Sequence, residues 1–247
     1  MNFAFTQNTI LKGLQSVMGV VVPRPAIPIL ASVHLKVENG ILEITGTDLE
    51  IFITSKVKLE SNEGEGEFLV PARLLHDLVK EMPDVLLEME ATEGEKAVIK
   101  CGTKGFYQLP LGSASDFPAI PYITANTSFN MESQTIKRMI SKTIFATSND
   151  DIRPVLNGVL FHLKTGELSL VSTDGHRLAK LKNENIDYSG ENKNVIVSNR
   201  SLNLLMKILG DSDNTNVILG ESKAMFDNRF LSFCRFHFKK NIRHLFN

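Results

Sequence analysis

The sequence has no tryptophan, only two cysteines in 247 residues, and no long uncharged apolar run. Cys101 and Cys234 lack the partner spacing that metal sites use, so we expect reduced, buried thiols rather than disulfides or a metal centre. No stretch approaches the roughly 18 uncharged residues of a membrane helix, and the N-terminus lacks the basic start and apolar run of a signal peptide. We therefore expect a cytoplasmic globular protein without metal.

Nucleotide-binding and histidine-based sites also lack support in the sequence. No glycine-rich loop opens a predicted helix, so no nucleotide or other cofactor is expected. His34, His76 and His162 have no metal-ligand spacing and are predicted to be surface residues.

Short motifs of the first half return about 127 residues later, in the same order. Arg24-Pro25 corresponds to Arg153-Pro154, Thr47-Asp48 to Thr173-Asp174, and Arg73 to Arg200. Each match alone is at the level of chance, but together they indicate two copies of one domain. Function is therefore expected in features that repeat.

Each copy is predicted to contain strands and helices in the order βαβββ, twice. In the first copy, helix 7–21 carries Leu11, Leu14, Met18 and Val21 on one face, and helix 72–82 has Leu74, Leu75, Leu78 and Val79 on its inward side. Asn39-Gly40 predicts a hairpin turn. The predicted strands lie near 31–38, 41–47, 50–57, 67–70, 85–91, 96–101 and 105–111, after a first strand that contains Phe3 and Phe5.

The second copy follows the same plan. Its predicted helices are 133–147 and 199–210, and its strands lie near 127–130, 155–164, 167–173, 177–182, 194–198, 215–220, 223–227 and 229–235. Serial strands with short turns predict antiparallel sheets with helices on one face, an α+β fold of two repeated domains. We expect domain 1 at 1–120, domain 2 at 121–235, and a divergent tail at 236–247.

Charge is distributed unevenly between helices and strands. The four predicted helices contain eight Lys or Arg and two acids, a sum of +6, so the remainder carries −7 to give the net −1. Arg73, His76 and Lys80 share one face of their helix, and the equivalent face of the fourth helix has Arg200, Asn203 and Lys207. Solvated helix faces are often basic, but four such helices favour binding of phosphates. With no aromatic on these faces, duplex backbone is a better target than single strands.

Ser172-Thr173-Asp174-Gly175-His176-Arg177 brings a hydroxyl, a carboxylate and an imidazole together in sequence. Neighbours in a strand or turn point in different directions, and a triad requires spatial convergence. Asp-Gly is a common turn pair, so we predict a turn here, with an enzyme using Asp174 and His176 as the alternative. No catalytic residue is assigned.

Several motifs together resemble the bacterial sliding clamp family, the β subunit of DNA polymerase III. They are Arg24–Leu30 (RPAIPIL), Thr45–Glu50 (TGTDLE), Val70–Arg73 (VPAR), Asp116–Pro118 (DFP), Arg153–Gly158 (RPVLNG) and Ser172–Leu178 (STDGHRL). The resemblance runs from residue 1 to about 235. It implies a non-catalytic processivity factor with three domains per chain, which closes as a head-to-tail dimer around duplex DNA.

The resemblance also implies site residues and partners. DNA contacts are expected at Arg24 and Arg73, to which the repeat and the charge pattern add Lys12, Lys80, Lys137, Arg138, Arg200 and Lys207. The domain 2 half of a pocket for partner peptides matches Leu156, Thr173, Gly175, His176, Arg177 and Leu178, and Phe106 falls on the ring interface. The implied partners are the polymerase III catalytic subunit, the clamp loader, and other polymerases and repair proteins with clamp-binding motifs.

The third domain of the family has no counterpart in this sequence, and the pattern ends inside the last strand of domain 2. We therefore expect a truncated or frame-disrupted clamp that is impaired in ring closure. One alternative is a clamp of the archaeal and eukaryotic kind, in which two-domain chains form trimers. Another is a peptide-docking adaptor that does not encircle DNA.

Overall fold

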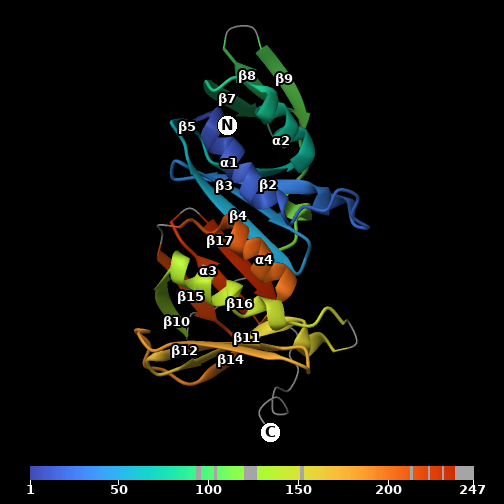
Figure 1. Ribbon diagram of the computed structural model, residues 1–247. Coiled ribbons are helices and arrows are strands. Elements are labelled where there is room, and N and C mark those ends of the chain that lie inside the picture. The colour runs from blue at the N-terminus through green and yellow to red at the C-terminus, as the bar shows by residue number, and fades with distance from the viewer. Residues whose placement is uncertain are drawn as a thin grey trace. The chain divides into compact units, whose positions relative to one another are not determined.

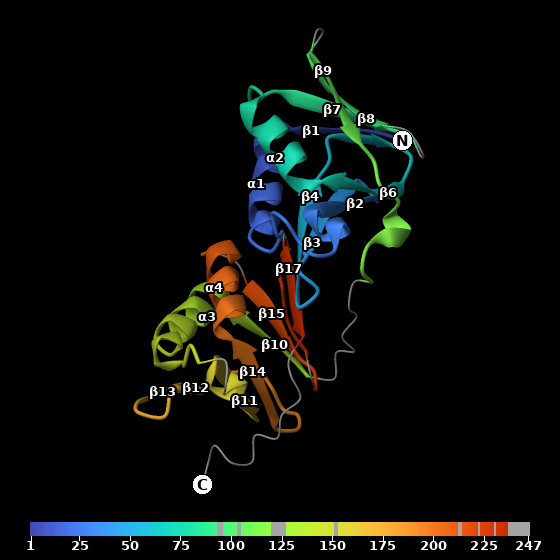
Figure 2. The same ribbon diagram turned by 90° about the vertical axis from the view of Figure 1, so that its right-hand side faces the viewer.

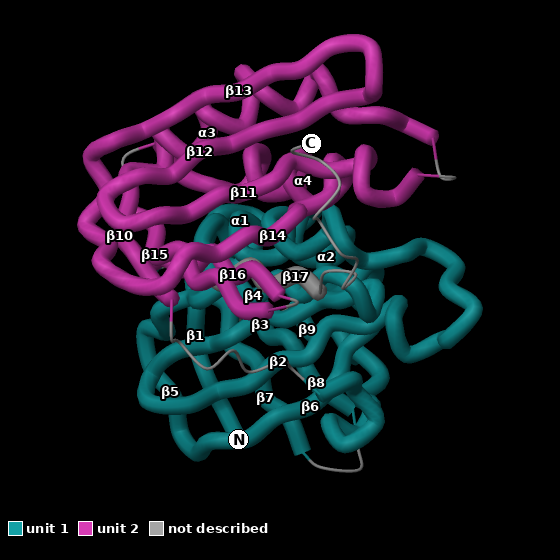
Figure 3. The backbone as a smooth tube through the Cα atoms, turned by 90° about the horizontal axis from the view of Figure 1, so that it is seen from below, with its two compact units in different colours: residues 1–120, 229–231 teal, residues 121–228, 232–247 magenta. Residues whose placement is uncertain are grey.

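In the computed structural model the chain forms two compact units, which Figure 3 colours separately: residues 1–120 with 229–231, and residues 121–228 with 232–247. The structure describes every residue except 93–95, 103–104, 120–126, 151–152, 212–213, 222, 230 and 237–247. Beyond Phe236, the predicted divergent tail therefore lies outside the described residues.

Unit 1 consists of two successive runs of strand, helix and three strands (Figure 1). The first run is β1 (Asn2–Thr6), α1 (Gln7–Met18), β2 (Ser32–Glu38), β3 (Ile41–Thr47) and β4 (Ile51–Lys58). The second is β6 (Gly66–Pro71), α2 (Ala72–Glu81), β7 (Leu86–Ala91), β8 (Lys96–Cys101) and β9 (Gly105–Pro110). Short elements accompany them: η1 (Pro28–Ala31) between α1 and β2, β5 (Ser61–Glu63) between the two runs, and η2 (Ala114–Asp116) after β9.

Unit 2 repeats this order. Its first run is β10 (Ser128–Glu132), α3 (Ser133–Ser141), β11 (Gly158–Lys164), β12 (Glu167–Thr173) and β13 (Leu178–Asn183). The second is β14 (Lys193–Ser198), α4 (Asn199–Ile208), β15 (Asn214–Leu219), β16 (Lys223–Asp227) and β17 (Leu231–Phe236). Two 3-10 helices, η3 (Ile144–Ala146) and η4 (Pro154–Leu156), lie between α3 and β11. The predicted succession of βαβββ units is confirmed.

All described strand pairs within the units are antiparallel, as predicted. Unit 1 has a five-stranded sheet in the order β5-β1-β7-β8-β9 and a second row of strands in the order β4-β3-β2-β6. Unit 2 has a four-stranded sheet, β13-β12-β11-β14, and the row β10-β15-β16-β17. Within each unit the two helices lie together on one side of the strands (Figure 2). The α+β fold class is confirmed.

The predicted hairpin turn at Asn39-Gly40 is present between β2 and β3. Both residues have positive φ, 52° and 74°, which a two-residue turn of this kind needs and which Asn and Gly adopt with little strain. The turn sets the register that places Leu35 opposite Ile44, and both side chains are fully buried.

Leu14 of α1, and Val21 just beyond the end of the helix, are buried as predicted, but the buried face of α1 is rotated from the predicted one. Ile10, Leu14 and Val17 are fully buried, whereas Leu11 and Met18 are only partly covered. The face shifts because α1 lies close to β3: a Cβ on Gly46 would stand 2.5 Å from Val17 Cγ1. On α2 the prediction for Leu74 is wrong, since that side chain is 47% exposed while Leu75 and Val79 are buried.

The predicted helix 133–147 is shorter in the structure and ends at Ser141. After Ser141 the hydrogen bonding changes to the 3-10 type, since the amide of Thr143 donates to the carbonyl of Ile140 at 3.0 Å. The Thr143 hydroxyl donates to the carbonyl of Met139 at 2.8 Å, and Ser172 Oγ donates to the carbonyl of Thr143. With that carbonyl engaged by β12, the chain continues as the separate 3-10 turn η3. Ser172 is thus a structural residue that ties η3 to the sheet.

His34 is buried, not on the surface as predicted. Its side chain is in β2 with 6% exposure, Nε2 lies 3.1 Å from Glu67 Oε2, and the ring stacks on Phe117 at 5.3 Å. Burial is the main cause that lowers the pKa of His34, because the charged form loses hydration. His76 and His162 are partly exposed.

Candidate nucleic-acid and peptide sites

The predicted DNA-binding residues lie on the helices of both units, or on the loop before η1 in the case of Arg24. Within the observed bounds of α1 to α4 there are seven Lys or Arg and two acids, Asp77 and Glu81. All eight predicted residues reach the surface, and only Lys137 is partly buried; the others are Lys12, Arg24, Arg73, Lys80, Arg138, Arg200 and Lys207. These residues together are called the cationic helix faces below.

The phase of α2 and α4 explains why their cations share a face. In α2, Leu75 and Val79 are buried, so Arg73 and Lys80 project from the other side. In α4, Leu202 and Leu205 are buried and the equivalent cations, Arg200 and Lys207, are exposed. The two units thus present the same pair of charges seven residues apart. Such flexible point charges suit phosphates and read no bases.

A shallow hollow of about 770 Å³ lies on α3 where Met206 of α4 borders it. Its lining is Gln134, Thr135, Lys137, Arg138, Ser141 and Met206. Lys137 Nζ lies 2.6 Å from Asp211 Oδ1, so one of the two cations at this hollow is already paired with an acid. The hollow therefore combines hydroxyl and amide donors with Lys137, which is neutralised by Asp211, and Arg138, for which the described part of the chain supplies no acidic partner.

The predicted peptide pocket corresponds in part to an apolar cavity of about 220 Å³ in unit 2, called the Leu178 cavity below. It is lined by Val155, Leu156, Gly158, Leu160, Val171, Ser172, Thr173, Leu178, Lys180 and Ile196. Three predicted residues, Leu156, Thr173 and Leu178, are in this lining. Gly175, His176 and Arg177 are not, and they lie on the turn that leads into Leu178. The exposed fraction of Leu178 is 66%, which is large for an apolar side chain.

Most of the floor of the Leu178 cavity was not predicted. It is a row across four strands, in which Ile196 of β14 pairs with Leu160 of β11, Leu160 with Val171 of β12, and Val171 with Lys180 of β13. Part of this row could have been found in the sequence, because residues two apart in a strand share a face. Val171 lies two residues before Thr173, and Lys180 lies two residues after Leu178. Finding it required the strand register.

Gly158 lines the same cavity for a packing reason. A Cβ there would lie 2.6 Å from the carbonyl oxygen of Val197 and 2.7 Å from a methyl carbon of Ile196. Glycine is therefore needed where β11 begins beside β14, and it leaves the space at the mouth open.

The Ser172–Arg177 motif is a turn, as predicted. Asp174 Oδ1 accepts from the backbone amides of His176 and Arg177, each at 3.0 Å, and Thr173 Oγ1 accepts from the amide of Gly175. These amides are the main cause that lowers the pKa of Asp174 to about 2, because they stabilise the carboxylate. No hydrogen bond joins the Asp174 and His176 side chains among the described residues.

The matching turn in unit 1 has the same hydrogen bonds. Asp48 Oδ1 accepts from the amides of Glu50 and Ile51, at 3.0 and 2.8 Å, and Thr47 Oγ1 accepts from the amide of Leu49 at 2.9 Å. Leu49 takes a positive φ of 78°, where unit 2 has Gly175 at 93°. The repeat therefore extends to individual hydrogen bonds, while only unit 2 adds the exposed His176 and Arg177.

Phe106 lies on β9, the edge strand of the five-stranded sheet, and is 61% exposed. Its neighbour Tyr107 is 42% exposed. An edge strand with exposed apolar side chains is suited to pairing with another chain, because its outer backbone groups are free to bond.

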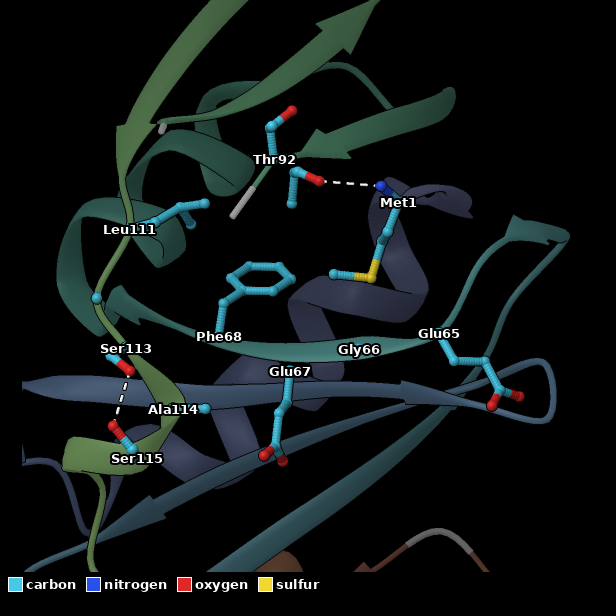
Figure 4. A pocket seen from close by; sticks show the side chains of 12 residues that line it. Met1, Glu65, Gly66, Glu67, Phe68, Thr92, Leu111, Ser113, Ala114 and Ser115 are labelled. Atoms are coloured by element: carbon cyan, nitrogen blue, oxygen red, sulfur yellow. Dashed lines mark hydrogen bonds between the residues drawn. The ribbon is translucent and has the colours of Figure 1, made fainter. Parts of the chain in front are cut away.

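A cavity of about 760 Å³ in unit 1 contains none of the predicted site residues. In Figure 4, Phe68 and the side chain of Met1 face its interior, and the Met1 ammonium donates to the carbonyl of Ala91 at 3.0 Å. Glu65 accepts from the amide of Asn39, and Glu67 pairs with His34. The charged groups around it thus have partners within unit 1.

Two further findings apply to the described part of the chain. None of its helices has the length and apolarity to cross a bilayer. Nor does it contain a group of three or more His, Cys, Asp or Glu side chains arranged to hold a metal ion.

Four βαβββ units in two repeated domains, with antiparallel sheets and paired helices, define the DNA-clamp fold. The crystal structure of the DNA polymerase III subunit β from Pseudomonas aeruginosa superimposes with a TM-score of 0.91 at 32% identity, over 98% of this chain and 66% of that one. The sliding clamp of Bacillus subtilis gives a TM-score of 0.90 at 26% identity, over 98% of this chain and 65% of that one.

The family models of the DNA polymerase III beta subunit match residues 1–121 with the N-terminal domain and residues 130–235 with the central domain. The chain therefore belongs to the DNA polymerase III beta subunit family. The beta sliding clamp of Pseudomonas aeruginosa is 36% identical over 90% of this chain, and that of Escherichia coli K12 is 36% identical over 87%. The chain spans 60% and 58% of the length of these two relatives.

Proposed function

We propose that this protein is a sliding-clamp subunit, a non-catalytic processivity factor that holds the replicative polymerase on duplex DNA in the bacterial cytoplasm, close to the nucleoid. Domain 1 would comprise residues 1–120 and domain 2 residues 121–235. The observation that carries the proposal is the repetition of exposed cations at equivalent positions of α2 and α4, within a family named for a polymerase subunit. Equivalent charges in each repeat suit a ligand that itself repeats, as a DNA backbone does.

In this proposal the cationic helix faces contact phosphates and leave the bases unread. Lysine and arginine on flexible side chains release counterions from DNA and tolerate movement along it. A clamp that slides needs this kind of contact, because base-specific hydrogen bonds would hold it at one sequence. No step of chemistry on the DNA is assigned to the chain.

The Leu178 cavity would take the aliphatic anchor of a short peptide from the polymerase III catalytic subunit, the clamp loader or a repair protein. Leu156 and Leu178 form apolar walls, and Thr173 fixes the adjacent turn through its hydroxyl, which donates to the carbonyl of Arg177 at 2.7 Å. Apolar anchors in small pockets supply much of the energy of peptide recognition. Gly175, His176 and Arg177 would form the rim.

Phe106 is proposed to lie on the first-domain side of the ring interface. Its exposure on an edge strand is the supporting observation. We expect the 247-residue chain on its own to be monomeric or irregularly associated, with weak affinity for duplex DNA. The alternative, a trimer of two-domain chains, would have a mass of about 80 kDa, three times the 27.5 kDa of one chain.

Fluorescence anisotropy with a labelled 30-base-pair duplex tests the proposed DNA contact. We expect weak binding at low salt. The logarithm of the association constant should fall linearly with the logarithm of salt concentration, and duplexes of unrelated sequence should bind with equal affinity. Absence of binding at 25 mM salt, or a strong preference for one sequence, would refute the proposal.

Removing the acid that pairs with Lys137 should increase DNA affinity. In D211N the Lys137 ammonium is released from its 2.6 Å contact and becomes available to a phosphate. We expect about a three- to five-fold gain in affinity and a salt slope steeper by up to about one unit. D187N is the control, because it removes the same charge from an exposed residue away from the helices. Equal gains in D211N and D187N would show that only net charge matters.

A peptide-docking adaptor is the second candidate function, and the Leu178 cavity favours it. Isothermal titration with a clamp-motif peptide, with and without duplex DNA, separates the two functions. Peptide binding in a chain that shows no DNA affinity at any salt concentration would support the adaptor.

A further inference from the structure

Phe145 is an exposed aromatic residue beside the predicted peptide site, in η3. Its exposed fraction is 57%, and the guanidinium carbon of Arg177 lies 5.7 Å from the centre of its ring. An arginine over an aromatic face at this distance is attracted by the electron density of the ring. Neither the sequence repeat nor the charge pattern pointed to Phe145.

The segment that carries Phe145 is fixed to the lining of the Leu178 cavity on both sides. Before it, Ser172 Oγ donates to the carbonyl of Thr143, and Ser172 is part of the lining. After it, the amide of Ser148 donates to the carbonyl of Leu156 at 2.8 Å, and Leu156 is also in the lining. The ring of Phe145 therefore has a defined place relative to the cavity, although it does not line it.

The guanidinium of Arg177 is held from two directions. Its Nε donates to Asp174 Oδ2 at 2.9 Å, and Asp174 is itself fixed by the two turn amides. The guanidinium carbon also lies over the ring of Phe145, within the range of a cation–π attraction. The terminal Nη groups have no hydrogen-bond partner among the described residues, and the side chain is 58% exposed. Four N–H donors are thus presented to solvent in a set orientation, one residue from Leu178.

We propose that Phe145 is a positioning residue that holds Arg177 ready to bind a carboxylate of the docked peptide. The inference rests on the proposed peptide docking and makes it more specific: the partner peptide carries an acidic side chain next to its aliphatic anchor. A planar guanidinium with two outward N–H groups matches the two oxygens of a carboxylate. The apolar cavity then binds the aliphatic side chain of the peptide, and the oriented Arg177 binds the acidic side chain next to it.

The test compares two peptides that share one leucine anchor and differ only by Asp or Asn beside it. Both are amidated at the C-terminus, so that the side chain is the only carboxylate that changes. Binding to the full 247-residue chain is measured by nuclear magnetic resonance titration, with the amide signals of Thr173 and Leu178 as reporters. We expect the unchanged protein to prefer the Asp peptide by about three-fold, the size typical of exposed ion pairs.

Two variants of Phe145 separate positioning from packing. F145L keeps an apolar side chain but has no ring face, and the Asp-to-Asn affinity ratio should fall to about one. F145Y keeps the ring and should keep the preference. The inference is overturned if F145L retains the ratio of the unchanged protein, including the case in which both affinities fall equally, or if the unchanged protein shows no preference. Failure of the unchanged protein to bind either peptide would instead refute the docking function.

Discussion

Neutralising the equivalent cation pairs of α2 and α4 should weaken duplex binding at 0.1 M salt by a factor on the order of 10³. Each phosphate contact contributes up to about 0.9 to log K for each tenfold decrease in salt below about 1 M, and the variant loses four such contacts. The variant replaces all four residues with glutamine: R73Q, K80Q, R200Q and K207Q. The measurement is anisotropy of a labelled duplex between 25 and 200 mM salt, and the slope of log K against log salt should become shallower by about three to four units.

The four substitutions should remove charge without disturbing the packing of either helix. Arg73 and Lys80 project from the side of α2 opposite Leu75 and Val79, so glutamine at both positions removes charge and leaves the core contacts unchanged. The same holds in α4, whose buried residues include Leu202 and Leu205. Exposed substitutions away from such packing usually alter stability by about 0.5 kcal/mol or less.

A matched control has the same loss of four charges on strands: K58Q, K96Q, K164Q and K193Q. It changes the net charge equally but leaves the cationic helix faces intact. We expect it to retain most of the affinity and the original salt slope. If both variants lose affinity to the same extent, the helices have no special part in binding and the clamp proposal loses its main support.

The fold was predictable because the repeat averages out errors at single positions. No propensity rule places Leu49 at a φ of 78°, yet the match of Thr47-Asp48 to Thr173-Asp174 predicts the same turn in both units. The turn forms because the Asp and Thr side chains bind the backbone amides, and those interactions do not depend on the residue at the left-handed position.

Helix faces and helix ends were less predictable. The α1 face shifted because the contact of Gly46 with Val17 decides how the helix lies on the sheet, and that contact joins residues distant in sequence. Helix α3 ended early, next to the point where the Ser172 hydroxyl of β12 donates to the carbonyl of Thr143. Both effects are tertiary, so periodicity within one segment carries no sign of them.

The candidate peptide site was also only partly predictable from the sequence. Leu156, Thr173 and Leu178 were predicted from a family resemblance and do line one cavity, but the row of Ile196, Leu160 and Val171 depends on strand register. Phe145 depends on where a 3-10 turn meets a neighbouring loop, and a single sequence gives no signal for that. The sequence therefore pointed to a candidate site through its turn, while the structure supplied the floor of the cavity and its aromatic neighbour.

The phenylalanine-to-alanine exchange at Phe5 should reduce the free energy of unfolding by about 3–5 kcal/mol, as expected for removing a large side chain from a packed core. Phe5 is fully buried in β1, packs on Phe3 with ring centres 5.8 Å apart, and lies opposite Leu87 of β7. F106A is the matched control in the same unit, since Phe106 is 61% exposed and its removal should change stability by about 0.5 kcal/mol or less. Urea denaturation followed by circular dichroism measures both.

A large loss of stability in F106A would mean that Phe106 supports the fold of unit 1, and its exposure could then no longer be explained by a ring interface. A stable F106A beside an unstable F5A would agree with a Phe106 side chain that is not needed for the fold of unit 1 and is available at a ring interface.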